Sequence, residues 1–184
     1  MKFIRLILFI GAVGFSCGVS AVAPHGAVTK LVAAKLPALG HRNWIIVADS
    51  AYPLQIAPGI ETVTVTESQL SAVKQVLAEL GRAKHVRPVI YIDSELKFVS
   101  ESTVPGISKY RRELNGLLAG KATQRMLHEN IIKKLDEAGK TFKVLLIKTP
   151  LTMPYTSVFF QLECGYWSAA SEQKLRDAMK LGSK

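Results

Sequence analysis

The sequence has few of the features that hold metals, nucleotides or disulfides. It contains only two cysteines, Cys17 and Cys164, and its four histidines lack the close spacing of metal ligands. It has no glycine-rich phosphate loop and no G-x-S-x-G nucleophile elbow. We therefore expect neither a metal nor a cofactor, and the usual nucleotide-binding and serine-hydrolase motifs are excluded.

Basic residues outnumber acidic ones, but they do not form a nucleic-acid-binding pattern. The chain has 24 lysines and arginines against 14 aspartates and glutamates, which gives a formal net charge of +10. The basic residues are scattered among acidic ones, and no basic run alternates with aromatic side chains. We therefore expect a solvated basic surface and no nucleic-acid partner.

Residues 1–23 have the pattern of a secretory leader. A basic start is followed by an apolar run over residues 6–15 and then by small residues. The run is shorter than the roughly 20 apolar residues that span a bilayer, so no membrane span is expected after processing. The sequence predicts a signal peptide over 1–23 and an exported (periplasmic or secreted) domain over 24–184. Lipid attachment at Cys17 is the less favoured alternative.

Strand and helix patterns alternate along the remaining chain. Continuous apolar runs predict buried strands, and apolar residues at helical spacing predict helices. The expected strands are 44–48, 60–65, 89–92, 144–147 and 157–162, and the expected helices are 27–39, 67–80, 105–118, 129–138 and 168–180. In the last helix, Leu175 and Met179 are expected to face inward. This order predicts a single-domain α/β fold of three layers, with helices on both faces of a largely parallel or mixed sheet.

Polar side chains follow several of the predicted strands. Asp49, Asp93 and Lys148 each end an apolar run, and Glu163 follows another. Ligands of such sheets bind beyond the carboxyl ends of the strands, which makes these residues candidates for a site. Aspartate is also a favourable turn residue, so a structural role explains each one alone at least as well.

Two segments resemble the ribose pyranase and fucose mutarotase family. The stretch from Leu39 to Pro53 resembles its opening motif of Gly-His, a few polar residues, an apolar strand, Asp and Pro. The stretch from Val158 to Tyr166 resembles the family's apolar strand followed by Glu-Cys and a tyrosine. Element order links the two motifs, and the resemblance covers roughly residues 27–167. The family ends in an Asn and a terminal strand, whereas here a helix-like tail follows Tyr166.

The resemblance implies a cofactor-free isomerase that interconverts ring forms or anomers of a monosaccharide and assembles into a ring. By position, His41 matches the family's proton donor and Asp49 a substrate-binding residue. Tyr166 matches the tyrosine of the C-terminal binding segment, and Lys148 lies near a basic sugar-binding position. Trp167 and Tyr166 offer apolar ring faces to the C–H surface of a sugar.

The predicted strand 44–48 separates His41 from Asp49. At about 3.3 Å per residue, the two side chains lie roughly 20 Å apart within one chain. One sugar cannot touch both, so an active site shared by neighbouring subunits of a homo-oligomer is expected.

Two other functions compete with sugar isomerisation. One is a sugar-binding or assembly protein on the same scaffold without turnover, and the other is a hydrolase that uses Cys164 or Asp49. A titrating histidine favours catalysis, because binding alone needs no such group. Cys164 is expected to be a small buried structural residue.

Overall fold

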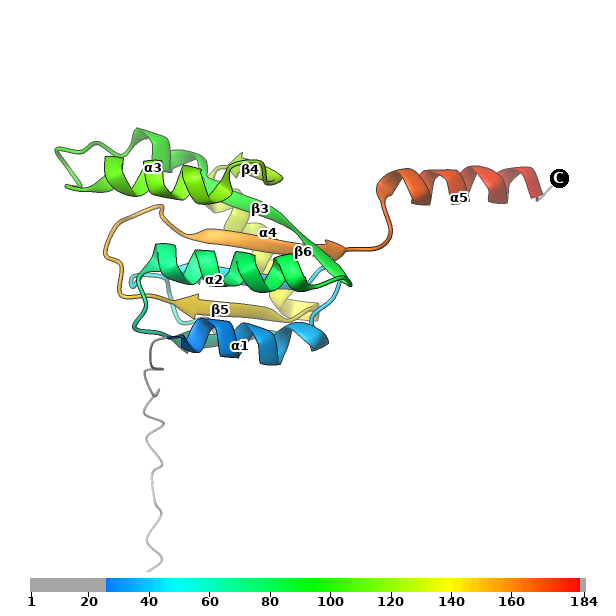
Figure 1. The fold of residues 1–184 in the computed structure, drawn as a ribbon, viewed down its shortest axis with the longest axis horizontal. Helices are drawn as coiled ribbons and strands as arrows, with labels where there is room; N and C mark the ends of the chain where they lie inside the picture. The colour runs from blue at the N-terminus through cyan, green and yellow to red at the C-terminus, as the bar shows by residue number, and fades with distance from the viewer. Residues whose placement is uncertain (1–25, 183–184) are drawn as a thin grey trace, which may run out of the picture.

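The computed structural model describes residues 26–182, and these form one mixed sheet flanked by helices (Figure 1). The sheet has the strand order β2-β5-β1-β6-β3-β4. The strands are β1 (Trp44–Ala48), β2 (Ile60–Thr64), β3 (Val86–Asp93), β4 (Thr123–Met126), β5 (Val144–Lys148) and β6 (Val158–Cys164). Only β6, among these strands, runs antiparallel to its neighbours, β1 and β3; the other pairs are parallel.

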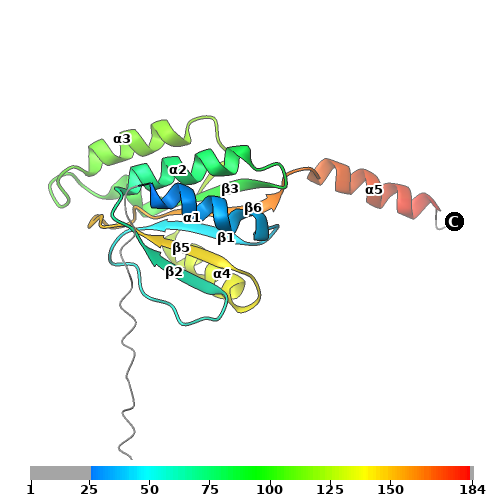
Figure 2. The ribbon, with the colours of Figure 1, turned by 60° about the horizontal axis from the view of Figure 1, so that its bottom comes forward.

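Helices cover both faces of the sheet, but unequally. On one face lie α1 (Ala27–Lys35), α2 (Gln69–Arg82) and α3 (Ile107–Leu118), and on the other lies α4 (His128–Thr141) (Figures 1 and 2). Short 3-10 helices, η1 (Leu36–Ala38) and η2 (Ser94–Phe98), extend α1 and β3. The predicted three-layer α/β/α fold with a mixed sheet is confirmed.

The central strand β1 shows why both faces must be covered. Its five apolar residues are all buried, and they alternate between the two faces of the sheet. Ile45 and Val47 pack in the core beneath α1, α2 and α3, whereas Trp44 and Ile46 pack beneath α4. Burying each such side chain stabilises the fold by about 1.5–3 kcal/mol. A strand of this composition is therefore stable only at the centre of a three-layer domain.

Three features differ from the sequence-based expectation. The first helix ends at Lys35 and continues as a 3-10 turn, because Pro37 cannot extend an α-helix. Strand β4 was not expected. The C-terminal helix α5 (Ala169–Gly182) forms, but none of its residues is buried, and it projects away from the domain (Figures 1 and 2). The prediction that Leu175 and Met179 face inward is therefore wrong: their exposed fractions are 45% and 59%.

The topology creates two distinct edges of the sheet. At the carboxyl edge, the ends of the five parallel strands meet the start of β6; its polar residues include Asp49, Asp93, His128 and Ser157. At the amino edge, the turn before β1 meets the end of β6; this edge carries His41, Glu163, Cys164, Tyr166 and Trp167. Strand β6 alone runs from the first edge to the second.

Residues 26–182 contain no helix with the length and apolar character needed to cross a membrane. The predicted signal peptide over 1–23 and Cys17 lie outside the described residues.

Candidate functional site

His41 lies at the tip of a tight turn that joins α1 and η1 to β1. The Asn43 side chain closes this turn: its Oδ1 accepts a hydrogen bond of 2.7 Å from the backbone N–H of Gly40. Arg42 adopts a left-handed backbone conformation with φ 74°, which is uncommon for a residue other than glycine. Its N–H donates to the carbonyl of Leu162 in β6, at 2.8 Å. The turn is thus tied to the end of β6, and His41 is exposed beside it.

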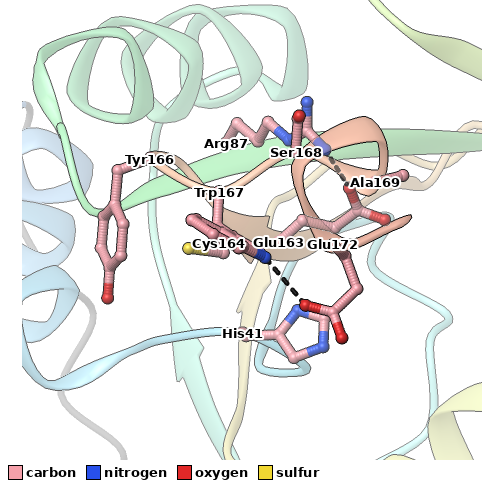
Figure 3. A pocket seen from close by; sticks show the side chains of 9 residues that line it. All are labelled: His41, Arg87, Glu163, Cys164, Tyr166, Trp167, Ser168, Ala169 and Glu172. Atoms are coloured by element: carbon pink, nitrogen blue, oxygen red, sulfur yellow. Dashed lines mark hydrogen bonds and ion pairs between the residues drawn. The ribbon is translucent and has the colours of Figure 1, made fainter. Parts of the chain in front are cut away.

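The exposed His41 lines a cleft of about 510 Å³ at the amino edge of the sheet. Figure 3 shows the side chains that line this cleft, which come from the His41 turn, β3, the end of β6 and the start of α5. Trp167 is about half exposed and Tyr166 is 79% exposed. An imidazole and two accessible aromatic rings therefore share one hollow surface.

Gly165, directly after β6, lies so close to the backbone at the start of β3 that only glycine fits at this position. A Cβ atom on Gly165 would lie 2.5 Å from the carbonyl oxygen of Lys84 and 2.9 Å from the nitrogen of Val86. Gly165 instead donates a hydrogen bond to the carbonyl of His85, at 2.9 Å. This close approach fixes the direction in which the chain leaves the sheet, and so where Tyr166 and Trp167 stand.

Glu172 and Trp167 hold the start of α5 against the cleft. The Trp167 indole N–H donates to Glu172 at 2.9 Å (Figure 3). Arg176 donates to the same carboxylate at 2.7 Å. The hydrogen bond from Trp167, assisted by Arg176, lowers the pKa of the Glu172 carboxyl. The cleft therefore carries a carboxylate in addition to His41.

Cys164 does not sit where the sequence placed it. It is only partly buried, and it lines the same cleft as His41. The expected small buried residue is therefore corrected to a half-buried thiol, because β6 ends at Cys164 and the next residues turn away from the core.

At the carboxyl edge, the protein's own groups hold Asp49. Its Oδ1 accepts a hydrogen bond from the Ala51 N–H at 2.9 Å, and its Oδ2 accepts one from the Ser157 hydroxyl at 3.1 Å. Ser157 is buried, whereas Asp49 is half-buried. The Asp49 carboxylate is thus fixed in direction and still partly open to solvent.

A second acid lies beside Asp49 and is paired with a histidine. Asp93 is completely buried at the end of β3, and its Oδ1 lies 3.1 Å from Nδ1 of His128, the first residue of α4. Burial raises the pKa of the Asp93 carboxyl, against the opposing effect of His128. The hydrogen bond that the His128 ring donates to Asp93 in turn raises the pKa of His128.

Buried side chains behind these residues keep the carboxyl edge rigid. The Gln69 side chain bonds both the hydroxyl of Tyr110, at 3.2 Å, and the carbonyl of Thr156. Its Oε1 accepts a hydrogen bond of 3.0 Å from Thr149, which follows β5. Loops after β5 and before β6 are therefore tied to α2 and α3 through one buried amide.

The five predicted site residues are divided between the two edges. His41, Tyr166 and Trp167 come together in the amino-edge cleft. Asp49 lies at the opposite end of β1. Lys148 is also at the carboxyl edge, but it lines a separate hollow of about 550 Å³ with Ser50, Thr64 and neighbouring residues.

No role was predicted for His128, although the structure places it beside Asp93 and Asp49. The reason is β4: without a strand predicted over Thr123–Met126, nothing indicated that His128, two residues after its end, reaches the carboxyl edge. Strand β4 is short, polar and at the border of the sheet, so it lacks the apolar run that revealed the other strands. The signal that could have revealed this site is a pair of polar residues, Asp93 and His128, at the ends of the neighbouring strands β3 and β4.

Neither edge holds a metal-like cluster: across residues 26–182, no three His, Cys, Asp or Glu side chains are grouped to bind an ion. What the arrangement offers is proton transfer. Each edge carries one partly or fully exposed imidazole together with a carboxylate.

No family model and no curated protein matches the sequence. Solved structures of similar fold do. They include RbsD of Bacillus subtilis in complex with D-ribose (19% identity, 78% of this chain and 95% of that chain, TM-score 0.48). A fucose mutarotase of Streptococcus pneumoniae in complex with L-fucose has 15% identity, coverage of 76% and 96%, and a TM-score of 0.49. FucU of Bifidobacterium longum has 12% identity, coverage of 73% and 94%, and a TM-score of 0.46. These proteins are of the type that the two sequence motifs resemble, which confirms that prediction.

The prediction of an exported protein is wrong. The structural neighbours, which are of the RbsD and FucU type, contradict it. The alternative of a lipid-anchored exported form through Cys17 falls with it.

Proposed function

We propose that residues 24–184 form a cofactor-free sugar mutarotase or pyranase, which interconverts ring forms or anomers of an aldose. The observation that carries this proposal is the position of His41. A tied turn holds its imidazole in an open cleft beside two exposed aromatic rings, and the turn bears the Gly-His motif. The neighbours named for ribose and fucose support the same substrate class.

The reaction requires only proton transfers. Opening an aldose ring breaks the bond between the anomeric carbon and the ring oxygen, while the anomeric hydroxyl loses its proton and the ring oxygen gains one. A histidine that titrates near neutrality can supply or accept such a proton. His41 is the proton donor in this proposal, and Tyr166 and Trp167 contact the C–H faces of the sugar.

The site is completed by a second copy of the chain. His41 and Asp49 lie on opposite edges of the sheet. The whole of β1 separates them, and a strand rises roughly 3.3 Å per residue. A sugar held by both residues must therefore lie between two subunits, so that the amino edge of one faces the carboxyl edge of the next. A ring in which every subunit repeats this contact has no unpaired edge. Asp49 orients the sugar through its hydroxyl groups, and Lys148 is a further binding residue.

A sugar-binding protein without turnover is the competing proposal, because the tail after Trp167 departs from the family pattern. An NMR saturation-exchange assay separates the two. We expect the protein to accelerate anomer exchange of at least one sugar in a panel of aldoses that includes ribose and fucose. Sugar-dependent shifts without accelerated exchange for any member would establish binding alone. Neither effect with any aldose would overturn the proposal.

A further inference from the structure

Asp93 has an unusual environment for an ionisable side chain. It is fully buried, and it is the most deeply buried acid among residues 26–182. Its Oδ1 is paired with His128, whereas its Oδ2 has no hydrogen-bond partner among the described residues. Burying a carboxyl with only one of its oxygens satisfied costs stability. A hydrophobic residue would fill this position at lower cost, so the carboxyl has a use beyond packing.

The rest of the environment fixes His128 with its second nitrogen free. The His128 backbone N–H donates to both oxygens of Glu95, at 3.0 and 3.2 Å, which anchors the start of α4. Tyr155 stands edge-on to the imidazole, with 5.8 Å between ring centroids. The side chain is 36% exposed, and Nε2 makes no hydrogen bond within residues 26–182. The ring is therefore held from behind, with one nitrogen available.

We propose that Asp93 is a positioning residue, which holds His128 in one orientation and one tautomer so that Nε2 acts as the base of the reaction. A neutral imidazole bonded to a carboxylate through Nδ1–H has its lone pair on Nε2. That His128 acts on a sugar rests on the proposed function. The pairing of Asp93 with His128 does not depend on that function.

The two histidines then divide the proton transfers. His128 Nε2 takes the proton of the anomeric hydroxyl, and the O–H electron pair forms the carbonyl bond. The bond from the anomeric carbon to the ring oxygen breaks, and His41 of a neighbouring copy gives its proton to that oxygen. The product is the open-chain aldehyde, and ring closure on either face returns both protons. The Asp93 carboxylate stabilises the imidazolium formed on His128.

This arrangement predicts a pH dependence of defined sign. As a base, His128 acts in its neutral form, so the rate increases as pH rises through its pKa. The groups facing the imidazole are Asp93 from β3, Glu95 from η2, Asp49 after β1 and the Tyr155 ring. The three carboxyls raise the pKa of His128, with Asp93 the largest contributor. Removing the Asp93 charge should therefore move this rise to lower pH.

The first test needs no substrate. We expect an NMR titration of the histidine rings of the full chain to show His128 titrating at lower pH in Asp93→Asn than in the unchanged protein. His41 and His85 should be unaffected. Asp177→Asn, which removes an exposed charge on α5, is the matched control and should move none of these resonances. An unmoved His128 in folded Asp93→Asn would overturn the inference.

A second measurement covers the case in which Asp93→Asn does not fold. In the unchanged protein, ¹⁵N shifts of the His128 ring at high pH should report the Nδ1–H tautomer, and an Nε2–H tautomer would overturn the proposal. Where anomer exchange is found, Asp93→Asn should lower the maximal rate by about 10-fold or more. It should change KM little and shift the pH profile downward. An unchanged rate and profile would also count against Asp93, whereas no exchange in the unchanged protein fails only the proposed function.

Discussion

The two edges of the sheet are built in opposite ways. At the carboxyl edge, Asp49 and Asp93 are hydrogen-bonded within the chain, and a buried amide, Gln69, braces the loops behind them. At the amino edge, His41 and Tyr166 are exposed. Contacts within the chain therefore hold the carboxyl-edge half of the proposed site, whereas the amino-edge half is exposed on the surface.

The strand directions account for this contrast. Five parallel strands end at the carboxyl edge, so their polar end residues converge and can bond one another. Only the single antiparallel strand ends at the amino edge, and the chain then departs as α5. The helix that follows β6 does not pack over this edge, because none of the residues of α5 is buried, and His41 and Tyr166 therefore stay exposed.

The largest effect should come from the exposed edge. His41→Ala is expected to lower anomer exchange by about 10²-fold or more, the scale of a general acid–base group. Sugar binding should change much less, because the turn and cleft remain. Exchange rate and affinity are both measured by NMR on the same sample, with His85→Ala as the control for loss of a histidine. Full activity in His41→Ala would remove this residue from the mechanism.

Joining the two edges in trans tests the comparison directly. Inactive His41→Ala and Asp49→Ala proteins, dissociated together and reassembled, should recover about a quarter of the activity, because random pairing unites two intact residues at that share of interfaces. Each parent reassembled alone is the control. No recovery after proven subunit mixing, or an active monomer, would contradict a site shared between subunits.

A smaller effect should distinguish how the two edges are held. Gln69→Leu should destabilise the fold by about 1–3 kcal/mol, because it leaves buried hydrogen-bonding groups without a partner. Glu163→Gln removes the exposed ion pair with Arg87 at the amino edge and should cost less than about 1 kcal/mol. Urea unfolding measures both, and Gln173→Leu on the exposed face of α5 is the control for the substitution. Equal losses at the two edges would mean that both are held by comparable contacts.

The smallest effect is expected at Cys164. Although this thiol shares the cleft with His41, the proposed reaction needs no nucleophile, so Cys164→Ser should leave anomer exchange within about a factor of two in a protein of unchanged fold. The circular dichroism spectrum checks the fold. A specific loss of activity in the folded variant would instead favour a thiol hydrolase.

The sequence predicted the elements that have an apolar pattern, and it missed the strand that lacks one. The run Trp44–Ala48 gave both ends of β1, and its length placed His41 and Asp49 at opposite edges, as the structure has them. The polar strand β4 carried no such run, and His128 was missed with it. Periodicity also predicted α5, but a periodic stripe does not tell whether anything packs against it, so the inward-facing Leu175 was wrong.

Asp93 illustrates a further limit. Its place after an apolar strand made it one of several candidates, and turn residues occupy the same position in many sheets. Only the three-dimensional pairing with His128, 35 positions later in the chain, separates it from the others. A contact between the ends of two neighbouring strands leaves no local trace in a single sequence.

The pairing of β1 also constrains how the protein is made. Its two neighbours are β5 and β6, so Trp44 finds its partners only at Val144 and Gln161. During synthesis, the apolar strand leaves the ribosome long before either partner exists, and an unpaired strand of this kind is prone to associate with other chains. Because the central ladder closes through contacts so distant in sequence, folding should be slow for a domain of this size. Expression at reduced temperature should therefore increase the yield of folded protein more than any stabilisation of α1 or α2.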